Sequence, residues 1–332
     1  MKIYMYSKGI KVKWRVIGLF RYVIKRVLSA IITVWIVITI TFFLMRLMPG
    51  GPFDGDKIKP QVKANLEAKY GLDKPLGEQY AIYMKNLVKL DLGESMQFKG
   101  RHVSETIKTS FPKSAKIGGL AVVTSVIIGL GLGIISALKS DRWPDRLCMF
   151  ISTLGITIPS FVISALLIYI FASKMRILPT TGLDNWKSYI MPVIALAGSS
   201  TAFITRLTRS KLIDVMKSDY IRTAKAKGLS KRTVIFKHAL KNSIIPVVTY
   251  LGPLVAGILT GSFVVEKIFS IPGLGKEFVS NVNTRDYSAL LGVIVFYSVL
   301  IVICNLVVDL LYVAIDPRIK LESNEGWGKS SG

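Results

Sequence analysis

The chain has few cysteines and few histidines. Its two cysteines, Cys148 and Cys304, lie in separate apolar runs of the 332-residue sequence, so neither a disulfide framework nor a CxxC metal site is available. The two histidines, His102 and His238, are too far apart for an HExxH zinc site. A GxxxxGK[ST] phosphate loop is also missing. We therefore expect no metal site and no catalytic residue in this chain.

Acidic residues are scarce beside basic ones. Twenty Asp and Glu stand against 44 Lys and Arg, a formal net charge of +24, on a chain that is 51% hydrophobic. The mean hydropathy of +0.48 excludes a disordered or fibrous protein and argues against an ordinary soluble domain. Positive charge on a soluble protein suggests nucleic acid, but here the basic residues adjoin apolar runs and lack interleaved aromatics. We expect no nucleic-acid partner.

Six apolar stretches approach the ~20 residues that a helix needs to cross a bilayer. They cover residues 27–47, 114–138, 147–172, 189–205, 246–265 and 289–312. The fourth is the shortest and contains Gly198-Ser199-Ser200-Thr201. We keep it as a span because the strongly basic segment after it would otherwise lie outside the cell. The sequence thus predicts an all-α integral membrane protein with six transmembrane helices.

The distribution of Lys and Arg sets the orientation. Residues 1–26 carry eight basic residues and no acid, which places the N-terminus in the cytoplasm. They resemble the start of a signal peptide, but the following apolar run is long and lacks a small-residue cleavage site, so we interpret it as an anchor. The inner segments then carry 25 basic and 7 acidic residues, and the outer ones 17 and 12. Residues 313–332 are expected to form a cytoplasmic tail.

Two apolar patterns predict further structure. Residues 48–113 show helical periodicity, so we expect a small folded extracellular subdomain. The periodic positions are Val62, Leu66 and Tyr70, and then Tyr80, Tyr83, Met84 and Leu87. In the second span, Gly129 and Gly133 form a small-xxx-small pair. No strand precedes these glycines, so the pair favours close helix packing over nucleotide binding.

The segment 206–245 between the fourth and fifth spans is the one constellation that indicates a mechanism. It is rich in Lys and Arg, and its apolar residues are too few to cross a bilayer. We expect Asp219 to cap a helix that runs to Lys227, Gly228 to end it in the left-handed conformation, and Ser230 to cap the next helix. The pattern predicts a cytoplasmic helix–turn–helix. The alternative is a basic loop lying on anionic lipid.

This segment resembles the cytoplasmic EAA loop of ATP-binding-cassette (ABC) importer permeases. The resemblance rests on Asp219-Tyr220-Ile221-Arg222-Thr223-Ala224-Lys225-Ala226-Lys227-Gly228-Leu229-Ser230 and on His238-Ala239-Leu240-Lys241-Asn242. Ala224 and Gly228 match the general pattern, whereas Arg222, Thr223 and Lys241 depart from it as the peptide subfamily does. The resemblance to B-type subunits of bacterial oligopeptide permeases covers nearly the whole chain. Its further motifs are Gly71-Leu72-Asp73-Lys74-Pro75-Leu76, Thr157-Ile158-Pro159-Ser160-Phe161, Glu266-Lys267-Ile268-Phe269-Ser270-Ile271-Pro272-Gly273-Leu274-Gly275, Arg285-Asp286-Tyr287 and Asp316-Pro317-Arg318.

The resemblance implies a type I importer transmembrane domain over residues 114–312, in a bacterial cell membrane, that does no chemistry itself. The implied partners are a second, C-type permease subunit, two ATP-binding subunits that use ATP and Mg²⁺, an extracellular peptide-binding protein, and membrane lipid. The implied substrate is an oligopeptide, and dipeptide or nickel import remains an alternative.

The resemblance also implies that the loop couples to the ATPase subunits, with small residues at Ala224, Ala226 and Gly228 allowing close approach and Arg222, Lys225 and Lys227 pairing with acidic groups. The residues assigned to this coupling are Asp219, Tyr220, Arg222, Thr223, Ala224, Lys225, Ala226, Lys227, Gly228, Leu229, His238, Leu240 and Asn242.

Polar residues inside the spans are candidates for the pathway lining, with simple packing as the alternative. They are Thr157, Pro159, Ser160, Ser199, Ser200, Thr260 and Ser262. The loop after the fifth span is expected to form an outer gate, to meet the substrate-delivering protein or, as we favour, to form a packed structural cap. Its candidate residues are Glu266, Pro272, Gly273 and Gly275.

Two other function classes find little support in the sequence. An intramembrane enzyme needs a catalytic pair at membrane depth, and Asp309 is the only acid there. We expect Asp309 to pair with a basic residue such as Arg206. A channel needs a selectivity filter, and no filter-like segment appears.

Overall fold

The computed structural model describes residues 2–47, 49–54, 59–261 and 263–315, with the side chains of 2–22, 260–261 and 309–315 excepted. Helices dominate this part of the chain, which contains no strand beyond an isolated bridge between Glu94 and His102. The elements are α1 Lys2–Leu47, α2 Pro60–Lys69, α3 Leu76–Val88, α4 Val103–Leu138, α5 Trp143–Thr157, α6 Ser160–Leu167, η1 Ile168–Lys174, η2 Trp186–Tyr189, α7 Ile190–Met216, α8 Asp219–Ala226, α9 Lys231–Thr233, η3 Val234–Ala239, α10 Leu240–Ser243, α11 Ile245–Gly261, α12 Phe263–Ile268, α13 Leu274–Asn283 and α14 Tyr287–Ile315.

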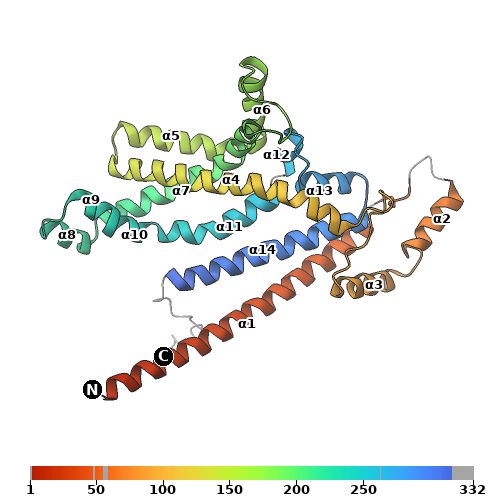
Figure 1. Ribbon diagram of the computed structural model, residues 1–332, viewed down its shortest axis with the longest axis horizontal. Coiled ribbons are helices and arrows are strands. Elements are labelled where there is room, and N and C mark those ends of the chain that lie inside the picture. The colour runs from red at the N-terminus through yellow and green to blue at the C-terminus, as the bar shows by residue number, and fades with distance from the viewer. Residues whose placement is uncertain (1, 48, 55–58, 262, 316–332) are drawn as a thin grey trace, which may run out of the picture.

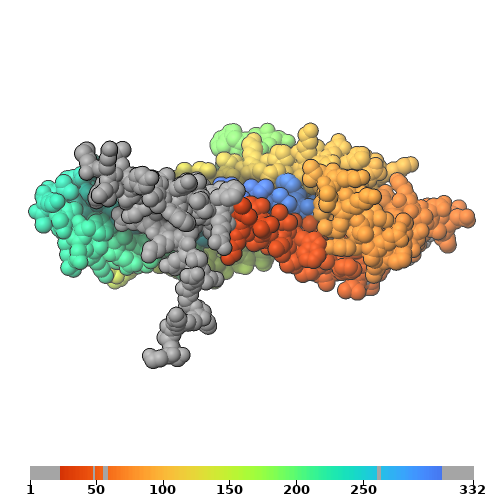
Figure 2. Space-filling view, turned by 90° about the horizontal axis from the view of Figure 1, so that it is seen from below, coloured from red at the N-terminus to blue at the C-terminus, as the bar shows by residue number. Residues whose placement is uncertain are grey.

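Long helices run side by side and form a bundle with two distinct ends (Figure 1). Helices α4, α5 and α7 pack on one another, α11 contacts α4, α7 and α14, and α14 contacts α1. The short helices α8 to α10 gather at one end, and α2 and α3 lie at the other (Figures 1 and 2). The outer subdomain and the basic loop are therefore at opposite ends of the bundle.

Five described helices are long and apolar enough to cross a membrane, or six spans if the bent pair α5–α6 counts as one. The bounds of two spans differ clearly from the sequence prediction. The second helix begins at Val103 rather than at 114, and the fourth continues to Met216 rather than ending at 205. The predicted loop 206–245 is thus shorter, because α7 extends as a helix beyond its apolar part. Residues 316–332 of the predicted tail lie outside the described residues.

The third span is broken rather than continuous. Helices α5 and α6 meet at 105° around Ile158 and Pro159. Ile158 has an extended backbone (ψ 121°), as steric contact with the proline ring favours, and Pro159 lacks the N–H that a continuing helix would use. The predicted kink therefore separates two helices.

The glycine pair of α4 packs against α7 as predicted. A Cβ at Gly129 would lie 2.8 Å from Ile204, and a Cβ at Gly133 would lie 2.6 Å from Thr208 and 2.8 Å from the Thr205 carbonyl oxygen. Only glycine allows the two backbones to approach this closely. The close packing fixes α7, which carries candidate site residues, against α4.

The outer subdomain is anchored to the ends of α1 and α14. Tyr80 and Tyr83 pack against buried Phe42, and burial raises the pKa of the Tyr83 phenol. The Arg46 guanidinium donates to Gln79 Oε1 (3.1 Å) and lies over the ring of Phe42. The predicted apolar face of α3 is thus used, whereas α2 buries none of its residues.

Candidate functional site

The basic loop folds as a small helical unit with its own apolar core. Ile221 and Ala224 of α8 meet Val234 and Ala239 of η3. This cluster rests on the adjoining ends of two long helices, through Leu212, Val215 and Met216 of α7 and through Ile134 and Ala137 of α4. Because its core is continuous with these helices, a displacement of the loop would displace α4 and α7.

The turn between α8 and α9 has the local structure that the sequence predicts. Gly228 adopts the left-handed conformation (φ +73°) and donates to the Lys225 carbonyl (3.0 Å), while Leu229 donates to the Ala224 carbonyl (3.4 Å). This is a Schellman motif, which satisfies carbonyls at the end of α8. Ser230 then caps α9 by accepting from the Thr233 N–H at 3.3 Å.

Two details of the loop prediction are wrong. Asp219 does not cap α8: Ser218 occupies the N-cap, and its side chain makes no capping hydrogen bond. Ala224 is not at the exposed tip, because its spacing from Ile221 places both on the buried face of α8. Its small side chain allows α8 to approach η3 rather than a partner.

The outer surface of the loop is exposed and basic. Arg222, Lys225 and Lys227 are all exposed, as are Ala226 and Gly228. Arg222 has only a 3.5 Å contact with Asp219, and the two side chains are 76% and 97% exposed. These cations are therefore accessible to an acidic partner surface.

The last part of the loop closes the unit. Asn242 donates to the Tyr220 hydroxyl (2.8 Å), which joins the start of α8 to α10. Leu240 begins α10, and His238 lies half-buried in η3, a π-helical turn. Thr223 donates to the Asp219 carbonyl (3.0 Å) and is used within α8. Leu229 is 39% exposed.

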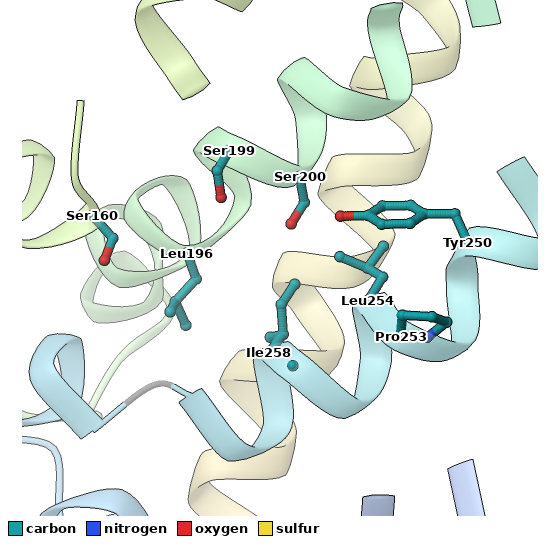
Figure 3. A pocket seen from close by; sticks show the side chains of 9 residues that line it. Ser160, Leu196, Ser199, Ser200, Tyr250, Pro253, Leu254 and Ile258 are labelled. Carbon is teal, nitrogen blue, oxygen red and sulfur yellow. The ribbon is translucent and has the colours of Figure 1, made fainter. Parts of the chain in front are cut away.

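A cavity of about 230 Å³ lies between α6, α7 and α11. It brings together Ser160, Ser199 and Ser200, three of the predicted pathway residues, with Tyr250 of α11 opposite them. Figure 3 shows the Tyr250 hydroxyl directed toward Ser200. The remaining lining is Leu196, Pro253, Leu254, Gly257 and Ile258. The cavity thus has a few hydroxyls on an apolar wall, and the described residues of its lining include no carboxylate, ammonium or guanidinium group.

The other predicted pathway residues lie elsewhere. Thr157 and Pro159 are exposed at the α5–α6 break and do not line the cavity. The side chains of Thr260 and Ser262 lie outside the described residues. Tyr250 was not predicted, although a phenol four residues after Pro246 in an otherwise apolar span could have indicated it.

The predicted outer gate has the geometry of a packed cap. Glu266 is buried (1% exposed) and accepts from the Lys276 N–H at 3.1 Å, at the start of α13. Gly273 and Gly275 are buried against Glu266, and a Cβ at Gly275 would lie 2.7 Å from the Phe263 Cα. Pro272 is the exposed member of this turn.

The sequence reasoning missed a buried ion pair at the end of the bundle that carries the basic loop. Asp145, 3% exposed, receives two hydrogen bonds from Arg209, from Nε to Oδ1 (2.7 Å) and from Nη2 to Oδ2 (2.6 Å). It also accepts from the Ser136 hydroxyl and from the Asp141 N–H (2.8 Å). The available signal was an acid, Asp145, between basic residues and just before an apolar run.

A second missed carboxylate joins the outer elements. Asp286 is fully buried and accepts from the Ser95 hydroxyl, the Met96 N–H (3.1 Å) and the Ala289 N–H (3.1 Å). It therefore caps α14 and holds the loop before α4.

The remaining polar side chains that the structure describes bear on the question of a metal site and on the pairing predicted for Asp309. Among the described residues no group of three His, Cys, Asp or Glu could hold a metal ion. Arg206 donates to the Thr153 hydroxyl at 2.8 Å. The side chain of Asp309 lies outside the described residues, so its expected pairing stays a prediction.

Comparisons with known proteins identify this arrangement. Two family models match: "Binding-protein-dependent transport system inner membrane component" over residues 129–321, and the N-terminal model of the same membrane components over 19–120. The dipeptide transport system permease protein DppB of Bacillus subtilis is 46% identical over 91% of this chain and 98% of its own length. The oligopeptide transport system permease protein OppB of Salmonella typhimurium is 44% identical over 91% of this chain and all of its own.

Solved structures agree on the fold. A chain of the inward-facing MetNI methionine ABC transporter matches with a TM-score of 0.55 at 14% identity, covering 64% of this chain and 97% of its own. An amino acid ABC transporter crystallised with histidines matches with a TM-score of 0.51 at 18% identity, covering 63% and 94%.

The helix bundle with its basic loop is that of a transmembrane subunit of an ABC importer. The chain belongs to the family of binding-protein-dependent transport system inner membrane components. It is a multi-pass permease of the cell membrane, not an enzyme, and the family works with separate ATPase and substrate-binding subunits.

Proposed function

We propose that this permease imports oligopeptides and that its basic loop, residues 217–244, transmits ATP-driven motion from an ATPase subunit. The observation that carries the coupling role is the packing of the loop core directly on α4 and α7. The exposed cations Arg222, Lys225 and Lys227 supply charge complementarity to an acidic groove.

The cavity between α6, α7 and α11 is the proposed site of peptide passage. Hydroxyls of Ser160, Ser199, Ser200 and Tyr250 can exchange hydrogen bonds with peptide N–H and C=O groups in succession. The lack of charged groups on this lining suits substrates that differ in their side chains. An oligopeptide is supported by the OppB relatives at 43–44% identity, and a dipeptide, the second candidate, by the DppB relative at 46%.

The complete importer in this proposal contains further subunits of three kinds. A second, C-type permease closes the other half of the pathway, two ATPase subunits bind ATP and Mg²⁺ on the cytoplasmic side, and an extracellular protein delivers the peptide. The opposite placement of the basic loop and the outer subdomain supports this polarity (Figure 1).

Purification of the tagged chain from its host membranes, followed by reconstitution in liposomes, tests the proposal. We expect an ATPase subunit to co-purify and oligopeptides to stimulate ATP hydrolysis and to enter the lumen. Absence of an ATPase from the purified complex contradicts the proposal, and accumulation of dipeptides alone selects the second candidate.

The coupling role is tested at Gly228. Asp and Asn both tolerate the left-handed backbone, so Gly228→Asp adds a negative charge at the tip while Gly228→Asn adds a similar shape without the charge. No atom outside the neighbouring residues lies within 4 Å of this position. We expect the Asp variant to lose ATPase binding and uptake far more than the Asn variant. Unchanged uptake by both would show that the tip is not the coupling element.

A further inference from the structure

The buried ion pair Asp145–Arg209 has no assigned role, and it lies where the basic loop joins the bundle. We propose that this pair is a positioning element for transport: it locks α4, α5 and α7 into one unit, so that movement of the loop displaces the pathway hydroxyls together. This inference rests on the proposed function of the loop.

One carboxylate connects three elements. Asp145 lies in the first turn of α5, Arg209 in the cytoplasmic half of α7, and Ser136 near the end of α4. The fourth donor, the Asp141 N–H, comes from the α4–α5 turn, where Asp141 itself has a left-handed backbone (φ +63°). The carboxylate therefore ties this turn and its two flanking helices to α7.

The bond between α5 and α7 has the geometry of a strong clamp. Both oxygens of Asp145 accept from different nitrogens of Arg209, at 2.7 and 2.6 Å, and this two-point contact fixes orientation as well as distance. Asp145 is nearly inaccessible and the Arg209 side chain is 25% exposed. Water competes little for such a pair.

The same two helices are joined at two further positions toward the pathway. Arg206 donates to Thr153 at 2.8 Å, and a Cβ at Gly155 would lie 3.0 Å from the Gly198 carbonyl oxygen. Helix α5 then ends at the break before Ser160, while α7 carries Ser199 and Ser200. All three hydroxyls on this side of the cavity thus belong to α7 or to the chain that follows α5.

The loop acts on this unit at its other end. Leu212 lies three residues after Arg209 and is fully buried in the loop core. Ile134 of α4, two residues before Ser136, is partly buried and packs against the same core. The opposite wall of the cavity comes from α11, through Tyr250, Leu254 and Ile258. If α4, α5 and α7 move as one rigid unit, a movement of the loop changes the distance between α7 and α11. If the ion pair is absent, α7 can move without α5.

The test uses the complete importer in liposomes, with ATP hydrolysis and peptide uptake measured on the same preparation. The variants are Asp145→Asn, Arg209→Gln and the double variant. We expect the amount of peptide taken up per ATP hydrolysed to fall roughly tenfold, a factor within the ordinary range for coupling between two sites. The rate of ATP hydrolysis should stay near that of the wild type. Arg209→Lys keeps the charge but not the two-point contact, so its loss should be smaller.

The double variant separates coupling from folding. Each single variant leaves one buried charge without its partner and can lower stability, whereas the double variant leaves none. It should assemble with the ATPase like the wild type and still show reduced uptake per ATP. Asp214→Asn is the matched control, because this exposed acid lies on the same helix, and it should change neither quantity.

Two results overturn the inference: wild-type uptake per ATP in the double variant, or a fall of uptake and hydrolysis in equal proportion. Either leaves the proposed function intact as long as the wild-type complex contains its ATPase and the Gly228→Asp variant loses it. Failure of those two controls would instead contradict the proposed function.

Discussion

At the scale of single residues, two features hold the helices in place: glycines where two backbones approach closely, and buried carboxylates. Glycine is needed where a helix touches another backbone, as at Gly133, and is dispensable on the other faces, as at Gly131, where an added Cβ would meet no atom within 4 Å. Buried carboxylates such as Asp286 serve as multiple acceptors that join segments far apart in sequence.

Gly133→Ala should destabilise the permease by about 1–3 kcal/mol, because the added methyl group overlaps the Thr205 carbonyl and Thr208 and forces α4 and α7 apart. Thermal unfolding of the purified permease in detergent measures this. Gly131→Ala on the same helix is the control and should leave the unfolding temperature nearly unchanged. Equal effects of the two substitutions would contradict the close-packing account.

Asp286→Ala should loosen the loop before α4, because it leaves the buried Ala289 N–H and the part-buried Met96 N–H without their acceptor, at a cost of about 1–3 kcal/mol for the buried group. Hydrogen exchange of residues 95–98 should accelerate markedly. Asp73→Ala, at an exposed position of the same subdomain, serves as the control. Slow exchange in the Asp286 variant would show that the loop is held by other contacts.

At the scale of elements, helix ends decide the geometry. Pro159 divides the third span and turns α6 away from α5 by 105°, and Gly228 divides the basic loop into two short helices. In each case a local backbone requirement sets the direction of the next element. The apolar face of α8 then determines which residues of the loop remain available to a partner.

Gly228→Val should destabilise the α8 end by about 1–2 kcal/mol, since a β-branched residue disfavours the left-handed backbone even though space is free. Hydrogen exchange across residues 221–229 measures the loss. Gly228→Asn should exchange more slowly than the Val variant because Asn accepts this conformation. The reverse order would rule out backbone strain as the cause.

At the scale of the whole molecule, the excess of Lys and Arg at one end predicts how the bundle is oriented in the membrane. The helix that carries the basic N-terminal segment begins toward the end where the basic loop lies, and the outer subdomain lies at the other end (Figure 1). In the proposed function, the end with the basic loop meets an ATPase and the opposite end meets a delivery protein.

Single cysteines introduced into a variant without Cys148 and Cys304 test this orientation. Leu90→Cys, 86% exposed on the outer subdomain, should react with a membrane-impermeant thiol reagent added to intact cells. Lys139→Cys, exposed near the α4–α5 turn, should react only in inverted vesicles. Labelling of both from the same side would contradict the six-span topology.

Local sequence was sufficient to predict the class of fold and the helix–turn–helix structure of the basic loop, and it also yields the orientation, which stays a prediction. Apolar length, the excess of Lys and Arg and the turn residues Gly228 and Ser230 act locally or through the membrane, so they are readable without a tertiary structure. The glycine pair of α4 was readable for the same reason, because small residues at helical spacing mark a contact whatever the partner.

Which residues meet became visible only in three dimensions. Asp145 and Arg209, Asp286 and Ser95, and Ser200 and Tyr250 come from distant segments, and nothing local in the chain indicates their partners. The same holds for Ala224, which lies in the core of the loop rather than at its tip because burial depends on what packs against α8. Local sequence patterns determine where each helix begins and ends. Which helices become neighbours depends on how their apolar faces pack in three dimensions, and no local pattern shows this.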